Sequence, residues 1–212
     1  MSSGKRRLII VGGGELSRAV IDAAIAQGCW DIVGFVDPKP CEETVRRAGV
    51  RRLGDNGALS SLSDELLILA VGSVTVSSLR RDIVKRIDGC ASWATVVHPF
   101  SSVSPSANLC PGVLVMPGAV ICSGTSVGNH SIINLGATID HDVRIGSFVH
   151  IAPQVALGGG AVVGDDAYVG MGAIVRDHVT IGPRTLVGMG AVVSKEFPEG
   201  TTLVGIPAKP KT

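Results

Sequence analysis

The residues best able to do chemistry lie in one short stretch of the chain. Asn134 is followed by Asp140, His141 and Asp142 and then by His150, so that two imidazoles and two carboxylates fall within eleven residues. A neutral histidine beside a carboxylate is held in one tautomer and can deprotonate an amine or a hydroxyl near neutral pH. The alternative is that these side chains only occupy exposed corners of a repetitive fold.

A second candidate site is the glycine loop Gly12–Gly14, which separates the apolar run Leu8–Val11 from a helical pattern. Backbone N–H groups of such a loop can approach a phosphate, and Asp37, which ends the next apolar run, stands where an acid often meets a ribose or a base. Ser17 replaces the third glycine of the dinucleotide motif. The loop therefore indicates either a mononucleotide site or an ordinary tight turn.

Composition narrows the range of partners. The net charge is +1, no apolar run approaches the roughly 18 residues of a membrane span, and the five cysteines form no CxxC pair. We therefore expect a cytoplasmic protein with reduced thiols that binds neither nucleic acid nor a membrane. The closest spacing between any two of the five histidines is nine residues, which is a poor match to a zinc site, so no metal is expected.

The candidate base lies in a region with a strict period of six. Leu, Ile or Val stands at every sixth position from Val103 to Val193, sixteen times in succession, and the residue four places later is mostly small or β-branched. Neither an α-helix nor one long strand gives this period. It predicts a triangular coil with one short strand per hexad and three hexads per turn, stacked about 4.8 Å apart. A β-sandwich would instead need turn signals every 8 to 12 residues.

The first part of the chain has a different pattern, in which short apolar runs alternate with helical spacing. It predicts strands at 8–11, 32–36, 66–71 and 94–97, and helices after the glycine loop and at 78–87. On the second helix, Leu79, Ile83 and Ile87 are expected to face inward and Arg80 outward. We predict a Rossmann-like α/β domain at residues 1–98 and the coil domain at 99–212.

The whole chain resembles bacterial sugar acetyltransferases of the hexapeptide-repeat superfamily, which include sialic acid O-acetyltransferases and the bacillosamine and perosamine N-acetyltransferases. Three segments carry the resemblance: Ile132-Ile133-Asn134 followed by Asp140-His141-Asp142, then Phe148-Val149-His150, and the ending Gly205–Lys209. The resemblance implies that the coil is a left-handed parallel β-helix. It also implies a homotrimer in which acetyl-CoA lies along the groove between neighbouring β-helices.

The resemblance also assigns roles to residues. His141 matches the general base, Asp142 the adjacent acid that raises its basicity, and Asn134 a polar residue beside that base. His150 matches a residue that meets the acetyl donor. Gly159 lies eighteen residues beyond His141, so its N–H group is a candidate donor to the oxyanion.

Other positions of the family motif concern the two substrates. Met171 and Met189 fall where family members contact CoA through the backbone, and Gly13, Gly14 and Asp37 match a nucleotide-sugar pocket.

The loop also departs from its relatives. Several have Gly-His, a small residue and Lys where this chain has Glu15-Leu16-Ser17-Arg18, so that only the basic residue remains, as Arg18.

The expected activity is transfer of an acetyl group from acetyl-CoA to the amino group of a nucleotide-linked amino sugar. The alternatives are O-acetylation of a sialic-acid-like sugar or small alcohol, and a non-catalytic nucleotide-binding scaffold.

Overall fold

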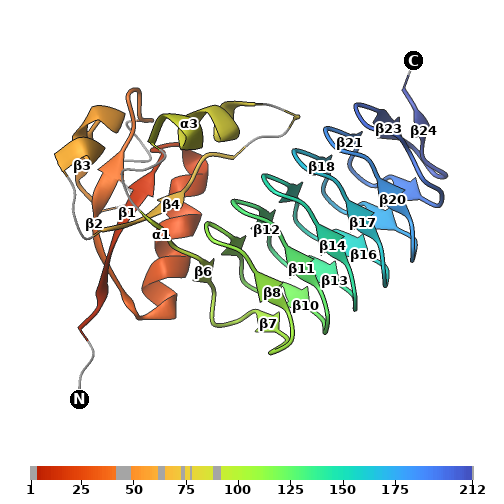
Figure 1. Ribbon diagram of the computed structural model, residues 1–212, viewed down its shortest axis with the longest axis horizontal. Coiled ribbons are helices and arrows are strands. Elements are labelled where there is room, and N and C mark those ends of the chain that lie inside the picture. The colour runs from red at the N-terminus through yellow and green to blue at the C-terminus, as the bar shows by residue number, and fades with distance from the viewer. Residues whose placement is uncertain are drawn as a thin grey trace. The chain divides into compact units, whose positions relative to one another are not determined.

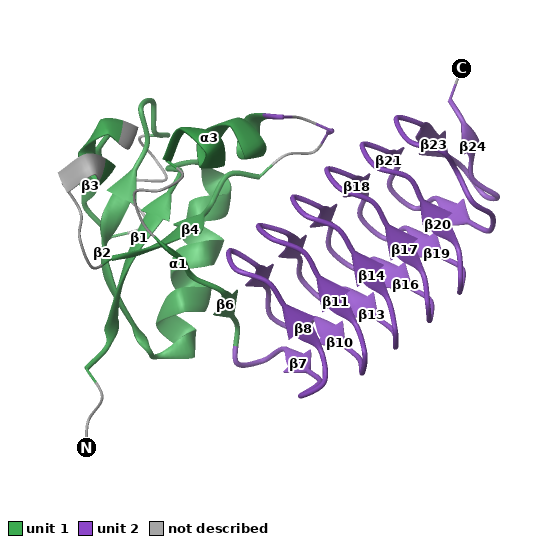
Figure 2. Cartoon of the chain, in the orientation of Figure 1, with its two compact units in different colours: residues 1–72, 79–98 green, residues 73–78, 99–212 purple. Residues whose placement is uncertain are grey.

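The computed structural model describes residues 4–41, 49–61, 65–72, 75–76, 78–87 and 92–211. The chain forms two compact units (Figure 2). One comprises residues 1–72 and 79–98, and the other comprises residues 73–78 and 99–212.

The first unit is built on a parallel sheet whose strand order is β3-β2-β1-β4-β5. Its elements are β1 (Arg6–Val11), α1 (Glu15–Gln27), β2 (Trp30–Val36), β3 (Arg52–Gly54), the 3-10 helix η1 (Asn56–Ser61), β4 (Leu66–Leu69), α3 (Leu79–Ile87), β5 (Ser92–Trp93) and β6 (Val96–Val97). The strand order changes direction between β1 and β4, and the carboxyl end of β1 leads into the glycine loop. Ligands of open α/β sheets bind at this kind of position.

Three details of this unit differ from the sequence prediction. The fifth strand of the sheet is β5 (Ser92–Trp93), whereas the strand predicted at 94–97 is present as β6 (Val96–Val97) but lies outside this sheet. The short edge strand β3 had no recognisable signal. On α3, Leu79 is 51% exposed whereas Arg80 is 4% exposed, which is the reverse of the expected arrangement.

The second unit is a triangular solenoid of stacked coils (Figure 1). The coils contribute short strands to three sheets, which are parallel except that the terminal strand of the third pairs antiparallel with its neighbour. Face one consists of β7 (Ser102–Val103), β10 (Val120–Ile121), β13 (Thr138–Ile139), β16 (Ala156–Leu157), β19 (Ile174–Val175) and β22 (Val192–Val193). Face two consists of β8 (Asn108–Leu109), β11 (Ser126–Val127), β14 (Arg144–Ile145), β17 (Val162–Val163) and β20 (Thr180–Ile181). Face three carries β9 (Leu114–Val115), β12 (Ile132–Ile133), β15 (His150–Ile151), β18 (Tyr168–Val169), β21 (Leu186–Val187), β23 (Thr202–Val204) and β24 (Lys209–Pro210).

The register explains the period of six. Thr138 pairs with Ala156 and His150 pairs with Tyr168, so equivalent residues of neighbouring coils are eighteen positions apart. The predicted aliphatic residue is the second residue of every strand from β7 to β22, and from Val115 onward each one is buried. Burying such a side chain contributes about 1.5–3 kcal/mol, so the repeated aliphatic column holds the solenoid together.

Polar groups inside the solenoid are paired between coils. The Thr125 hydroxyl, fully buried, donates to the carbonyl of Asp140 at 2.7 Å and accepts from the N–H of Val143 at 3.3 Å. Ser131 makes the same two kinds of hydrogen bond, to Gly146 and Val149. The Thr125 hydroxyl thus ties the coil before His141 to both ends of the corner that carries it.

Candidate active site

His141 lies at the corner between face one and face two, directly after β13. The equivalent corner positions of successive coils, eighteen residues apart, are Ser123, His141, Gly159 and Asp177. The His141 ring lies over Gly159: a Cβ atom added to that glycine would be 2.7 Å from Nε2 of His141. Real Cβ atoms do not approach other atoms so closely, so the ring position depends on a glycine in the next coil.

The His141 imidazole is paired with the next residue. Its Nδ1 is 3.0 Å from Oδ2 of Asp142, and the backbone N–H of His141 donates to Oδ1 of Asp140 at 2.7 Å. Asp142 adopts a left-handed backbone conformation with φ of 58°, which aspartate tolerates, and its carboxylate lies over Gly124 of the preceding coil. A glycine on each side of this corner therefore makes room for the histidine–carboxylate pair.

The electrostatic surroundings make His141 a stronger base. The hydrogen bond to Asp142 raises the pKa of His141 most, and the negative charges of Asp140 and Asp142 raise it further. With Asp142 at Nδ1, that nitrogen carries the ring proton and Nε2 is left to accept one. In a single chain the His141 side chain is 57% exposed, so a second surface would have to close over it to exclude water.

The Gly159 N–H group could donate a hydrogen bond to an oxygen atom that becomes negatively charged during a reaction. Within the described residues it donates no hydrogen bond, whereas the neighbouring Gly158 and Gly160 N–H groups donate to Val175 and His141. The ring nitrogen Nε2 of His141 lies over the same residue. This corner therefore holds a nitrogen that can accept a proton and an N–H group that can donate to a negatively charged oxygen.

We expect replacement of Asp142 by asparagine to move the pH dependence of kcat/KM to lower pH. In its expected role as general base His141 must be neutral, so activity should fall as pH drops through its raised pKa. The substitution removes the largest cause of the raised pKa of His141, so the acidic limb of the pH profile should move to lower pH. The maximum value of kcat/KM should fall by about 10- to 100-fold, because the His141 ring is less firmly oriented. Measurement of kcat/KM from pH 5 to 9 in both proteins tests this, and an unmoved limb would contradict the pairing.

Asn134 and His150 form a second polar cluster on face three. Nδ2 of Asn134 is 3.2 Å from Nε2 of His150, and Oδ1 of Asn134 accepts from the N–H of Leu135 at 2.8 Å. The Tyr168 ring meets the His150 ring edge-on, with 5.3 Å between centroids and an angle of 90° between planes. His150 is 9% exposed, so this cluster is considerably less accessible than the His141 corner.

These two clusters do not meet within one chain. The corner that holds His141 is opposite face three, which holds Asn134 and His150. One side of the triangle spans up to about 20 Å, because it contains six residues at about 3.3 Å each. Asn134 therefore stands beside His150 and not beside His141 of its own chain.

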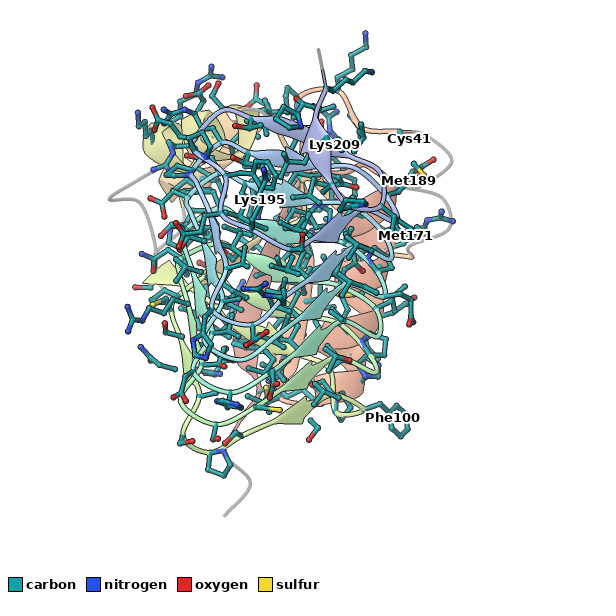
Figure 3. The ribbon with its side chains drawn as sticks, turned by 90° about the vertical axis from the view of Figure 1, so that its right-hand side faces the viewer. Cys41, Phe100, Met171, Met189, Lys195 and Lys209 are labelled. Carbon is teal, nitrogen blue, oxygen red and sulfur yellow. The ribbon has the colours of Figure 1, made fainter. Side chains whose placement is uncertain are left out.

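Met171 and Met189 lie on a third part of the solenoid, the edge between face three and face one. They occupy equivalent positions of consecutive coils, are 56% and 83% exposed, and lie next to each other at one edge in Figure 3. The carbonyl of Met171 accepts from the N–H of Gly190 at 2.8 Å, so this backbone oxygen is already engaged in coil stacking.

The glycine loop of the first unit is tightly closed on one side. Oδ2 of Asp37 accepts from the Gly13 N–H at 2.7 Å, and Oδ1 accepts from the Lys39 N–H at 2.7 Å. A Cβ atom at Gly13 would be 2.8 Å from the Phe35 ring. Gly13 and Asp37 thus fasten the loop to the end of β2.

The other side of the loop is open. Among the described residues, nothing lies within 4 Å of a Cβ atom built on Gly14, which is the N-cap residue of α1 and makes no side-chain cap hydrogen bond. The first turn of a helix leaves backbone N–H groups unpaired, which attracts anions. Arg18 stands on the next turn with a buried Nε that has no hydrogen-bond partner in the described part of the chain, and Glu15 is exposed in the first turn.

Tyr168 was not singled out from the sequence, although a signal for it existed. It is the only tyrosine of the chain and lies eighteen residues, or one coil, after His150. Coil spacing alone would have placed the two rings together on face three.

The structure gives two further findings on binding. The described residues contain no group of three or more His, Cys, Asp or Glu side chains that could hold a metal ion. In the same part of the chain, no helix has both the length and the apolar character needed to cross a membrane.

Comparison with known proteins places both units in known families. The PglD N-terminal domain model matches residues 7–87, and the bacterial transferase hexapeptide model matches residues 160–195. No curated protein matches the chain in sequence.

Solved structures match the chain over nearly its whole length. The acetyltransferase domain of PglB from Neisseria gonorrhoeae in complex with acetyl coenzyme A is 32% identical, with 98% of this chain and 100% of that chain covered and a TM-score of 0.89. PerB from Caulobacter crescentus in complex with CoA and GDP-perosamine is 36% identical, with 100% and 99% covered and a TM-score of 0.87. A histidine-to-asparagine variant of perosamine N-acetyltransferase from the same bacterium, bound to the same two ligands, is 35% identical, with 100% and 98% covered and the same TM-score.

The chain therefore belongs to the bacterial sugar acetyltransferases of the hexapeptide-repeat superfamily that carry a PglD-type N-terminal domain. The predicted fold class, a small Rossmann-like α/β domain followed by a left-handed parallel β-helix, is confirmed.

Proposed function

We propose that the protein transfers an acetyl group from acetyl-CoA to the amino group of a nucleotide-linked amino sugar. The observation that carries this proposal is the His141–Asp142 pair, which lies over Gly159 at a solenoid corner. The similar PglB domain and PerB structures contain acetyl coenzyme A, or CoA with GDP-perosamine, which supports the same pair of substrates here.

The chemistry needs one proton acceptor and no covalent enzyme intermediate. The amine nitrogen attacks the thioester carbon, and Nε2 of His141 takes the proton that the nitrogen loses as the C–N bond forms. The oxyanion of the tetrahedral intermediate accepts a hydrogen bond from the Gly159 N–H. As the C–S bond breaks, the CoA thiolate takes the proton back from His141, so the enzyme is regenerated.

A complete site requires more than one copy of the chain. Asn134 and His150 stand on the face opposite His141, yet acetyl transfer needs the donor and the base within contact of each other. A homotrimer would bring the His141 corner of one copy against face three or the Met171–Met189 edge of the next. Acetyl-CoA would then lie in the groove between two β-helices, with His150, Met171 and Met189 along it.

The nucleotide part of the acceptor would bind at the open side of the glycine loop. Gly14 and the first turn of α1 offer N–H groups to a phosphate, Arg18 offers a positive charge, and Asp37 retains acceptor capacity for a ribose or base. Gly13 leaves room for the Phe35 ring, which a side chain at this position would meet.

Substitutions of Arg18 and Glu15 should have opposite effects on acceptor binding. Arg18→Gln removes a charged donor to the phosphates and is expected to raise the KM for the nucleotide sugar about 10-fold, whereas Glu15→Gln removes a repulsive charge and is expected to lower it about threefold. The KM for acetyl-CoA should stay constant in both. Steady-state kinetics with each substrate varied in turn checks this, and equal shifts in the same direction would contradict the assignment.

Glu15 also favours a second candidate, O-acetylation of a sialic-acid-like sugar or a small alcohol. A carboxylate in the first turn of α1 opposes the binding of a diphosphate more strongly than that of a sugar acid with a single negative charge, and does not oppose that of a neutral alcohol. The same base can deprotonate a hydroxyl, so the His141 corner is compatible with either acceptor.

Release of free CoA from acetyl-CoA, measured across a panel of acceptors, tests the proposal. The panel should pair each nucleotide-linked amino sugar with its free sugar and with the analogue that has a hydroxyl in place of the amine. We expect turnover only with a nucleotide-linked amine. Turnover restricted to hydroxyl acceptors would establish the second candidate, and no turnover with any acceptor alongside nucleotide binding would establish a scaffold.

A further inference from the structure

The side-chain amide of Asn134 is fixed at both ends by different partners. The backbone N–H of Leu135, which can only donate, points to one amide atom of Asn134 at 2.8 Å and thereby identifies it as the oxygen. The amide NH₂ group consequently faces Nε2 of His150, at 3.2 Å. The orientation of this amide therefore follows from the backbone and does not depend on the histidine.

This arrangement determines the protonation of His150. An NH₂ group only donates, so Nε2 of His150 must accept, and a neutral imidazole with an accepting Nε2 carries its proton on Nδ1. A doubly protonated ring would place an N–H group against an NH₂ group, which is two donors face to face. Asn134 thus selects the neutral Nδ1–H form and opposes the cation.

The ring of His150 is also held against rotation. It is 9% exposed, and Tyr168 of the next coil packs edge-on against it with 5.3 Å between centroids. A half-turn of the ring would put a carbon in the place of Nε2 and leave the Asn134 NH₂ group without that partner. In the parallel register of face three His150 pairs with Ile132 and with Tyr168, so His150 and Tyr168 share one column, and Asn134 approaches the His150 ring from just after β12.

We propose that Asn134 is a positioning residue which keeps His150 neutral with its proton on Nδ1. On the proposed function, in which His150 meets the acetyl donor, His150 then acts as an N–H hydrogen-bond donor and not as a second base that competes with His141. The assignment of the tautomer follows from the geometry of face three alone and does not depend on the proposed function.

The variant Asn134→Asp tests this with almost no change of shape. One carboxylate oxygen of the new aspartate still accepts from the Leu135 N–H. The other takes the place of the Asn134 NH₂ group, so Nε2 of His150 faces a negatively charged acceptor and no longer a donor. The proton of His150 should therefore move to Nε2, and the negative charge beside the ring should raise the pKa of His150. The activity should fall about 100-fold in kcat near neutral pH if the Nδ1–H donor state is required.

Nitrogen NMR of protein labelled with ¹⁵N in the histidine rings reports the tautomer directly, and a His150→Gln protein assigns the His150 signals. We expect the Nδ1–H form in the unmodified protein and the Nε2–H or doubly protonated form in Asn134→Asp. Asn129→Asp is the matched control, because Asn129 is exposed at another corner of the solenoid and its substitution makes the same change in net charge. It should leave the His150 signals and kcat unchanged.

The outcomes separate this proposal from the proposed function. An Nε2–H or doubly protonated His150 in the unmodified protein at neutral pH would overturn the tautomer, whatever the activity. An altered tautomer in Asn134→Asp with unchanged kcat would overturn the donor role of His150. The expected tautomer in a protein that transfers no acetyl group to any acceptor would refute the proposed function and leave the tautomer standing.

Discussion

Replacement of His141 by alanine is expected to lower kcat by about 10² to 10⁴ while the affinity for acetyl-CoA stays nearly unchanged. The reason is that, among the described residues, only the imidazole of His141 places Nε2 over Gly159, whose N–H group is the proposed oxyanion donor. Single-turnover kinetics for the acetyl transfer step, with calorimetric titration of acetyl-CoA, would measure the two quantities separately. Near-normal kcat would exclude His141 as the base.

A mixed assembly gives a sharper form of this experiment. His141→Ala and His150→Ala chains should each be weakly active alone, but after co-expression some grooves would combine His141 from one copy with His150 from another. Random mixing makes this about one groove in four for a closed ring of identical subunits, so roughly a quarter of the unmodified activity should return. No recovery in mixed assemblies of confirmed composition would show that the two groups do not act in a shared groove.

Gly159→Ala is expected to reduce kcat by about 10² to 10³ with little loss of stability. The new Cβ would stand 2.7 Å from Nε2 and 2.8 Å from Cε1 of His141, so the ring has to move. The His141 side chain is 57% exposed and can swing into solvent at small cost, yet a base displaced by about 1 Å loses about 100-fold in rate. The backbone N–H of residue 159 remains, so the loss would report the position of the base and not the oxyanion donor.

Gly118→Ala is a suitable control because it also adds a methyl group to a solenoid corner. There the Cβ would be 3.6 Å from Gly136, which is ordinary contact, although the φ of +74° makes an alanine somewhat strained. We expect a stability loss of about 1–2 kcal/mol and full activity. Thermal unfolding and kcat should therefore be measured on both variants: Gly159→Ala should lose activity and keep its stability, whereas Gly118→Ala should lose stability and keep its activity. A Gly159→Ala protein with full activity would contradict the close approach of the His141 ring to Gly159.

The β-helix could be predicted in detail because each hexad repeats one environment. Sixteen aliphatic residues in strict register leave only one way to wind the chain. All were expected to point inward, and fourteen are buried; Val103 and Leu109, in the first coil, are half-buried. The pairing of His141 with Asp142 was also expected, because neighbouring residues at one corner need no long-range information.

Contacts between coils were harder to predict, although counting by eighteen residues shows which positions of neighbouring coils share a face. Asn134 was expected beside the base, but face three brings it to His150, sixteen residues away along the chain. Tyr168 joins them from the following coil. These relations depend on which hexads share a face, and a strict count by eighteen would have been required to find them.

The α/β unit was less predictable because its contacts are individual and not repeated. The helical pattern at 78–87 placed Leu79 inside and Arg80 outside, whereas the structure reverses them. Likewise, Asp37 was identified as a possible ligand group, but its two oxygens also hold the loop through Gly13 and Lys39, which no local pattern indicates. Tertiary packing overrides helical periodicity in such short elements.

The constant offset between coils also limits how such a protein can change length during evolution. A single-residue insertion in a coil would exchange inward and outward side chains along every later strand of that coil, whereas a duplicated block of eighteen residues would restore each column. The β-helix can therefore gain or lose length only by whole turns of eighteen residues. Turns added beyond Lys195 would leave His141, Gly159 and their neighbours untouched. The length of the β-helix can therefore vary without changing the corner that carries His141.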